Sequence, residues 1–149
     1  MTFAPSVVVD TSVAVKWFFD EPHSAQALKL LDSFRAGTLR PLAPDLIYPE
    51  FANAVWKRVA LDRLSPEDGA AIIATFLGLP FEITASFSLL LSAYRLAVEH
   101  RRSVYDALFL ALSLEAGADL VTADEHFYQA VHAHLSHVEW LGNWRLPLQ

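Results

Sequence analysis

Four acidic side chains are the residues of this sequence best suited to chemistry, because each stands where a predicted strand ends or a predicted helix begins. Asp10 follows a run of valines, Glu50 follows a proline, and Asp106 and Asp124 stand at two later helix starts. Taken singly, each is explained by helix capping or by a favourable charge near a helix N-terminus. Their joint arrangement is what indicates a site.

The strand ends and helix starts of one parallel sheet converge on one edge, so the four carboxylates are predicted to meet there. Two unit charges about 4 Å apart repel by about 4 kcal/mol at an effective dielectric of about 20. Such a cluster requires protonation or bound cations, and carboxylate oxygens are preferred ligands of Mg²⁺. Because no catalytic Lys or His adjoins these residues, the pattern favours metal-assisted hydrolysis of a phosphodiester.

Polar residues beside the four acids are candidates for supporting roles. Asn53 lies three residues after Glu50 on the same helix face. It is either an ordinary polar helix residue or a group that orients a phosphate or a water of the ion. The hydroxyls of Thr11, Ser12 and Thr122 adjoin acidic positions. Capping is the expected role of Ser12, whereas Thr122 can bond a neighbouring carboxylate.

The elements that must position these residues alternate between strands and helices along the whole chain. This alternation predicts an α/β fold with a parallel sheet covered on both faces. Helices outnumber strands, so some helices are expected to form an insertion or a separate lobe. The expected strands are residues 6–9, 39–43, 81–84, 119–122 and 138–140, and the expected helices are residues 13–19, 25–34, 45–64, 66–77, 86–101, 105–116 and 124–134.

Length and composition predict one intracellular globular domain over residues 1–149. The chain is 54% hydrophobic and 19% charged, which excludes intrinsic disorder. Cysteine is absent, which excludes disulfides, thiolate zinc sites and a cysteine nucleophile. The charge-free stretch at residues 69–81 is too short and too interrupted to span a membrane, and no secretory signal precedes the first apolar run. A cytoplasmic location and no membrane partner are therefore expected.

The net charge of −6 does not exclude a nucleic-acid substrate. If four of the 17 acidic residues gather in one site, 13 remain against 11 Lys and Arg, which leaves the rest of the surface nearly balanced. Net charge alone therefore does not decide the partner.

Four segments, in order, resemble the PIN-domain nucleases, and specifically the VapC-type toxins of bacterial toxin–antitoxin pairs. Residues 7–12 (VVVDTS) are similar to the first strand and leading aspartate of that family, and residues 49–54 (PEFANA) to its proline–glutamate–asparagine helix. Residues 105–107 (YDA) and 120–124 (LVTAD) are similar to the third and fourth acidic motifs. The resemblance runs through most of the chain with compatible spacing.

This resemblance implies a three-layer α/β/α sandwich on a parallel sheet of four to five strands and an endoribonuclease activity dependent on Mg²⁺ or Mn²⁺. It also implies a homodimer and inhibition by a small cognate antitoxin. By the same resemblance, Asp10, Glu50, Asp106 and Asp124 are the catalytic acids. Asp10, Asp106 and Asp124 are the metal ligands, Asp10 and Asp106 directly, while Glu50 and Asp124 complete the site directly or through water. The RNA substrate and its cut position rest on loops that vary within the family.

Two further features concern partners. Arg101 and Arg102 precede Asp106 and are either a solvated helix end or a contact for the RNA backbone. The aromatic-rich segment at residues 16–19 (KWFF) and Trp56 are either core or a surface for an antitoxin segment or a second protomer. An antitoxin arginine would pair well with the acidic cluster.

Other chemistries find less support. His132, His134 and His137 lack the surroundings of a zinc enzyme and are expected to be a surface cluster. A phosphatase that uses Asp10 as a nucleophile resembles Asp-x-Asp-x-Thr, whereas Ser12 stands at the second acidic position. The remaining alternative is a non-catalytic RNA- or protein-binding module on the same fold, which would have no reason to hold clustered charge.

Overall fold

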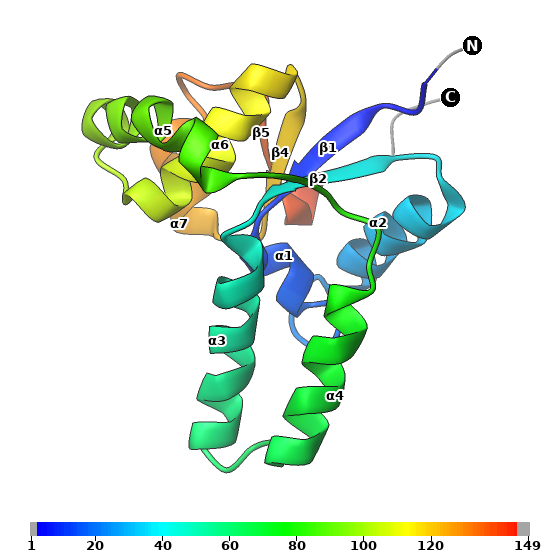
Figure 1. Cartoon of the computed structure of the whole chain (residues 1–149). Helices are drawn as coiled ribbons and strands as arrows, with labels where there is room; N and C mark the ends of the chain where they lie inside the picture. Colours follow the sequence, from blue (N-terminus) through cyan, green and yellow to red (C-terminus); the bar gives the residue numbers. More distant parts are fainter. Residues whose placement is uncertain (1–2, 146–149) are drawn as a thin grey trace.

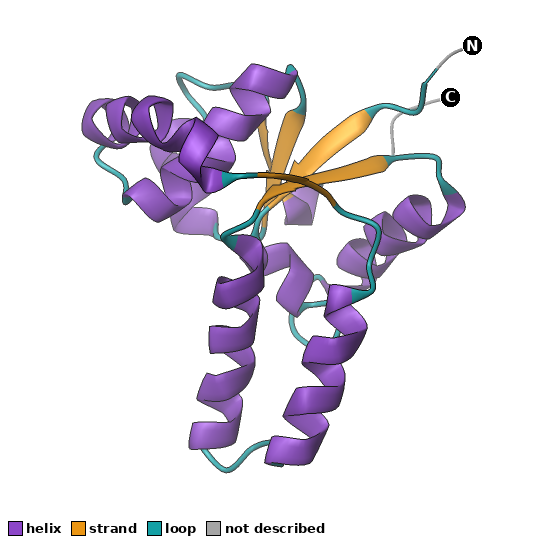
Figure 2. Cartoon of the chain, viewed as in Figure 1, coloured by secondary structure: helices purple, strands orange, loops and turns teal. Residues whose placement is uncertain are grey.

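The computed structural model describes residues 3–145 of the chain. Five strands form one sheet in the order β3-β2-β1-β4-β5, and every neighbouring pair is parallel (Figure 2). This confirms the predicted α/β fold with a parallel sheet of four to five strands. The strands are β1 (Ser6–Val9), β2 (Arg40–Pro44), β3 (Glu82–Thr84), β4 (Asp119–Thr122) and β5 (Val138–Trp140).

Helices cover both faces of this sheet and complete the predicted three-layer α/β/α sandwich. Helices α5 and α6 lie on one side of the sheet and α2 on the other (Figure 1). The helices of the described residues are α1 (Thr11–Val15), α2 (Ser24–Ala36), α3 (Ile47–Ala60), α4 (Pro66–Leu77), α5 (Ser86–His100), α6 (Val104–Ala116) and α7 (Glu125–Val131), followed by the short 3₁₀ helix η1 (Leu141–Asn143).

The central strand of the sheet is buried on both faces. Val7, Val8 and Val9 of β1 are all buried, as expected of a continuous β-branched run in a parallel sheet with both faces covered. Strand β1 lies between β2 and β4, with Val9 paired to Val121. The carboxyl ends of β1 and β4 are therefore neighbours, and the residues that follow them meet at one edge.

Helices α3 and α4 form a hairpin that projects away from the sheet, as the predicted separate lobe (Figure 1). The two helices pack closely at Gly69, where a Cβ atom would lie 3.2 Å from methyl carbons of both Val55 and Val59. Ser65 caps the second helix by accepting a hydrogen bond from the Asp68 backbone N–H, and Pro66 takes its first position, as predicted.

The helix predicted at residues 45–64 is shorter, and its two ends have separate causes. At the start, the Asp45 backbone N–H donates to the Thr84 carbonyl, and the Asp45 carboxylate accepts from the Ser86 N–H at 3.0 Å. Asp45 thus extends the β2–β3 pairing and caps α5 instead of its own helix. At the other end, Asp62 adopts a positive φ of 54°, which ends α3 before the predicted Leu64.

Other boundaries also differ from the sequence expectations by a few residues. The first helix ends at Val15 and continues as turns, so the prediction of residues 13–19 was wrong in extent. Helix α7 ends at Val131, because residues 132–135 turn toward β5. Within residues 3–145, no helix is both long enough and apolar enough to cross a membrane.

Candidate active site

The four predicted acids line a single pocket of about 150 Å³ at the carboxyl edge of the sheet. Asp10 directly follows β1 and Asp124 directly precedes α7. Glu50 lies in the first turn of α3 and Asp106 in the first turn of α6. The expectation that the four side chains converge is thereby met. The other side chains of this acidic pocket belong to Thr11, Ser12, Phe109 and Phe127.

Asp10 occupies the innermost position because it follows the central strand directly. Its carboxylate caps α1 by accepting from the Val13 N–H at 3.4 Å. Ser12 donates to one carboxylate oxygen and Thr122 to the other, each at 2.5 Å. The predicted bond between Thr122 and a neighbouring carboxylate is confirmed, and the two hydroxyls fix the orientation of Asp10.

The protonation of Asp10 is set mainly by burial, which disfavours the charged form. Burial raises the pKa of Asp10 from 3.8 to about 6, although the hydrogen bonds from Ser12, Thr122 and the Val13 N–H oppose the rise. The negative charge of Asp106 adds to the increase. The ionised form of Asp10 is therefore costly unless a cation compensates it.

Glu50 enters the acidic pocket from the first turn of α3. It follows Pro49, and its Oε1 accepts a hydrogen bond from the Thr11 hydroxyl at 2.8 Å. Burial raises the pKa of Glu50, and the charge of Asp106 raises it further against the lowering effect of the Thr11 bond. Glu50 and Asp10 are thus both destabilised as anions, and both are affected by Asp106.

Asp106 is the acid that already has a cationic partner. Its Oδ2 accepts from the Arg102 guanidinium at 3.2 Å, and its backbone N–H donates to the Ser103 hydroxyl at 3.1 Å. Ser103 therefore caps α6, as its spacing from Asp106 indicated. The Arg102 guanidinium also lies 5.4 Å from the centre of the Phe127 ring, so it borders the acidic pocket.

Asp124 is the exposed member of the four. Its Oδ1 accepts from the Phe127 N–H at 3.1 Å and caps α7. The sequence predicted helix capping as the simpler role of Asp124. Because a carboxylate has a second oxygen, Asp124 can cap α7 and also line the acidic pocket.

The supporting residues have distinct positions. Ser12 was expected to cap a helix, but the cap of α1 is Asp10; the Ser12 hydroxyl instead accepts from the Ala123 N–H at 2.9 Å and links the two loops. Asn53 is exposed and does not line the acidic pocket. Arg101 is exposed and takes a left-handed conformation, with φ 54°, at the end of α5.

Phe109 and Phe127 are the pocket residues that sequence reasoning missed. Each stands three residues after an acid of the site, Phe109 after Asp106 and Phe127 after Asp124. On a helix this spacing places both side chains on one face. The three-residue spacing was therefore visible in the sequence, but any amphipathic helix shows the same spacing.

The donor set of the acidic pocket fits a hard divalent cation. Its carboxylate oxygens are the ligands that Mg²⁺ and Mn²⁺ prefer, and Mg²⁺ typically takes one or two of them and keeps several waters. Burial, with a smaller contribution from the charge of Asp106, raises the pKa of Asp10 and of Glu50, so a bound cation would stabilise their ionised forms. In the described part of the chain, no group of three or more His, Asp or Glu side chains is placed so that it could hold a metal ion.

The three histidines considered as zinc ligands each contact a different partner. His132 bonds the Val138 carbonyl, His137 bonds the Ser113 hydroxyl, and the His134 ring lies 6.4 Å from that of His100. Burial lowers the pKa of His137. None of the three lines the acidic pocket.

The fold and the acidic pocket define a three-layer α/β/α protein with a carboxylate site at the carboxyl edge of a parallel sheet. The PIN domain family matches residues 7–133, and the chain therefore belongs to the PIN-domain family. Ribonuclease VapC12 of Mycobacterium tuberculosis is 28% identical over 133 residues, which cover 89% of this chain and 97% of that protein. The resemblance to VapC-type PIN domains is thus confirmed.

Solved structures share the fold at lower sequence identity. PAE2754 from Pyrobaculum aerophilum has a TM-score of 0.68 at 22% identity over 94% of this chain and 93% of that one. Mycobacterium tuberculosis VapC20, a sarcin-ricin loop cleaving toxin, has a TM-score of 0.63 at 19% identity, covering 84% and 95%. VapBC2 from Rickettsia felis, bound to a promoter DNA fragment, has a TM-score of 0.62 at 16% identity, covering 91% and 96%.

Proposed function

We propose that this protein is a divalent-metal-dependent endoribonuclease, the toxin of a type II toxin–antitoxin pair, which hydrolyses RNA phosphodiester bonds at the acidic pocket. One observation carries the proposal: Asp10, Glu50, Asp106 and Asp124, far apart in the sequence, line one pocket at the carboxyl edge of the sheet. Membership of the PIN-domain family and the relative named as a ribonuclease support the reaction class.

In this proposal Asp10 and Asp106 are the direct ligands of Mg²⁺ or Mn²⁺, and Glu50 and Asp124 complete the site directly or through water. The ion, when bound, activates a water molecule and stabilises the charge that develops on the phosphodiester. Ser12 and Thr122 hold both oxygens of Asp10, and Thr11 holds Glu50. Hydroxyls that fix metal ligands in this way reduce the reorganisation needed when the ion binds.

Phe109, Phe127 and Arg102 are proposed to shape the approach of the RNA. The two aromatic rings form the apolar part of the acidic pocket and limit the access of bulk water. The Arg102 guanidinium lies between Asp106 and Phe127, where it can bind a phosphate oxygen as RNA approaches. Arg101 is exposed beside it and adds positive charge to the same end of α5.

A cognate antitoxin protein is the proposed inhibitory partner, and a cytoplasmic location follows from this role. The similar structure from Rickettsia felis is that of VapBC2, a toxin–antitoxin complex, which supports an antitoxin partner for this chain. An antitoxin arginine placed in the acidic pocket would compensate the charge of Asp10 and Glu50, because guanidinium and carboxylate groups pair in bidentate geometry.

A homodimer is proposed to form through the exposed face of α5. Phe87, Leu91, Tyr94 and Val98 are 92%, 63%, 58% and 64% exposed and follow the helical spacing of one stripe. The opposite face of α5 carries the buried Leu89 and packs on α6. A contiguous apolar stripe on a surface is typical of an interface between proteins.

The test is RNA cleavage by the wild type and by Asp10→Asn with Mg²⁺, with Mn²⁺ and with EDTA. Asn keeps the size of the side chain and removes the charge, so we expect metal-dependent cleavage by the wild type and a loss of at least about 100-fold in the variant. Asp32→Asn on the exposed surface of α2 is the matched control and should cleave normally.

The same proteins separate the nuclease from a non-catalytic binding module. A metal site should raise the melting temperature of the wild type in Mn²⁺, and Asp10→Asn should lose this increase. Equal cleavage by the wild type and Asp10→Asn would identify a contaminating nuclease. No cleavage of total RNA and no metal-dependent stabilisation would contradict the proposed function and favour the binding module.

A further inference from the structure

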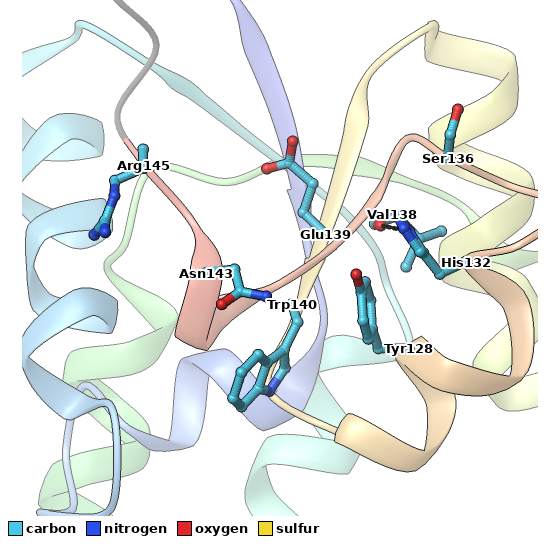
Figure 3. A pocket seen from close by; sticks show the side chains of 8 residues that line it. All are labelled: Tyr128, His132, Ser136, Val138, Glu139, Trp140, Asn143 and Arg145. Atoms are coloured by element: carbon cyan, nitrogen blue, oxygen red, sulfur yellow. Dashed lines mark hydrogen bonds between the residues drawn. The ribbon is translucent and has the colours of Figure 1, made fainter.

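A second pocket, of about 340 Å³, lies between α7, β5 and η1 and contains none of the four acids (Figure 3). Figure 3 shows Tyr128 and His132 from the α7 segment, Glu139 and Trp140 from β5, Asn143 from η1, and Arg145 beyond it. This combination of rings, a carboxylate, an amide and a guanidinium has no role in the site described above. We call it the β5 pocket.

The β5 pocket shares one element, helix α7, with the acidic pocket. Helix α7 supplies Phe127 to the acidic pocket and the next residue, Tyr128, to the β5 pocket. Trp140 is paired in register with Thr122, whose hydroxyl holds Asp10. The two pockets thus share helix α7, and the strands that carry Thr122 and Trp140 are neighbours in the sheet.

The aromatic rings of the β5 pocket are held in place by their own contacts. Tyr128 and His132 are stacked, with ring centres 4.5 Å apart and planes at 29°. The Trp140 ring packs edge-on against His23, with centres 5.1 Å apart. Gly142 lies so close to the indole that a Cβ atom there would come within 2.5 Å of it. Rings fixed in this way lose little freedom when a flat ligand stacks on them.

The polar groups of the β5 pocket match the edges of a nucleobase. The Nδ1 of His132 lies 3.1 Å from the Val138 carbonyl oxygen, to which it donates, so Nε2 is the ring nitrogen that can bond a ligand. Glu139 is half-buried and forms no salt bridge within residues 3–145. A base amino group can donate to the Glu139 carboxylate, and the Asn143 amide can both donate and accept. Arg145 supplies a cation for an adjoining phosphate.

We propose that the β5 pocket binds one nucleobase of a single-stranded RNA segment and thereby positions the strand whose phosphodiester lies in the acidic pocket. The proposal rests on the nuclease function and specifies its substrate as unpaired RNA. Unpaired bases stack on aromatic side chains and expose their hydrogen-bonding edges, whereas the edges of paired bases are occupied.

The binding test uses Asp10→Asn protein with EDTA, so that no RNA is cut. Fluorescein-labelled octamers of A, C, G and U are titrated, and the dissociation constants are measured by fluorescence anisotropy. Removal of one stacking ring is expected to weaken binding about tenfold, so Tyr128→Ala should bind the tightest octamer about tenfold less well. Tyr128→Phe keeps the ring and should restore most of the affinity. The control Trp56→Ala, which removes an exposed ring from α3, should bind normally.

A second measurement locates the base directly. Octamers that carry one 5-iodouridine are irradiated on the same protein, and the attached peptide is identified by mass spectrometry. Attachment to Tyr128, His132 or Trp140 is expected. Normal RNA binding by Tyr128→Ala, or attachment only at residues outside the β5 pocket, would overturn this inference and leave the nuclease proposal intact. If no octamer binds and total RNA is not cleaved by the wild type, the nuclease function itself fails, and the inference with it.

Discussion

At the scale of single residues, Asp10 accepts hydrogen bonds that stabilise its ionised form, whereas burial of the carboxyl group destabilises that form. Two hydroxyls and a backbone N–H stabilise the anion, but burial dominates and raises the pKa to about 6. A residue retained at such a position costs stability at neutral pH. This cost is expected of a group kept for binding a cation rather than for holding the fold together.

We therefore predict that Asp10→Asn stabilises the metal-free protein at neutral pH. A pKa raised on folding means that the folded state binds the proton of Asp10 more tightly than the unfolded state does. The stability that this proton contributes to the fold is therefore fully present below about pH 3.8 and is lost as the pH rises through about 6. The variant should gain up to about 3 kcal/mol of unfolding free energy at pH 7.5, and little at pH 4. Urea titrations with EDTA at several pH values measure this difference.

Asp32→Asn is the control for this prediction and should show no comparable pH dependence. A gain for Asp10→Asn that is equal at pH 4 and pH 7.5 would contradict the electrostatic explanation. It would assign the effect to packing or to hydrogen bonds, since neither depends on the charge of the carboxyl group.

At the scale of elements, the α3–α4 hairpin positions Glu50 and depends on close helix packing. Gly69 lies in the first turn of α4 and allows the two helices to approach through Val55 and Val59. A side chain at this position must displace two methyl groups that belong to the opposite helix. Overpacking of this kind typically costs about 1–3 kcal/mol.

We predict that Gly69→Leu lowers the unfolding free energy by about 2 kcal/mol and separates the distal ends of α3 and α4. Chemical denaturation measures the first effect, and a pair of spin labels near the hairpin tip measures the second. Gly78→Ala is the control, because a Cβ atom there meets only the Thr75 carbonyl oxygen, at 3.4 Å. If Gly69→Leu is as stable as Gly78→Ala, the close approach at Gly69 is not required.

At the scale of the whole molecule, the exposed stripe on α5 is an apolar surface that the described part of the chain leaves uncovered. Phe87 is 92% exposed and Val98, three turns later, is 64% exposed. Burying such side chains against a second copy removes apolar surface from water at about 25 cal/mol per Å². The stripe thus supplies a physical reason for the proposed homodimer.

We predict that Leu91→Asp converts the protein to a monomer, because a buried unpaired carboxylate at the centre of the stripe is strongly unfavourable. Light scattering coupled to size-exclusion chromatography should give twice the chain mass for the wild type and the single mass for the variant. Leu28→Asp on α2, at a position that is also exposed, is the control and should remain dimeric. A dimeric Leu91→Asp, or a monomeric wild type, would contradict the α5 interface.

Much of the architecture could be predicted from the sequence because its signals are local. The valines of β1 and the Ser65-Pro66 start of α4 each specify an element through residues a few positions apart. The ends of helices were less predictable. Asp45 caps α5, which is 41 residues away, and no local pattern announces such a partner.

The four acids that line the acidic pocket were likewise predicted from their positions at the ends of elements, and Thr122 as a possible partner for a carboxylate. The sequence could not show that Ser12 would bridge two loops or that Arg102 would reach both Asp106 and Phe127. Those contacts depend on which strands are neighbours in the sheet and on how α6 and α7 are set against it.

The sequence by itself therefore determined the kinds of elements, their order and the acids at their ends, since periodicity and capping act over a few residues. Tertiary structure alone decided which groups share an environment. It buried Asp10 deeply enough to raise its pKa to about 6, and it placed Tyr128 and Trp140 in one pocket that shares helix α7 with the acidic pocket. Burial and pocket shape arise from residues distant in the chain, so they exist only once the sheet and its helices have assembled.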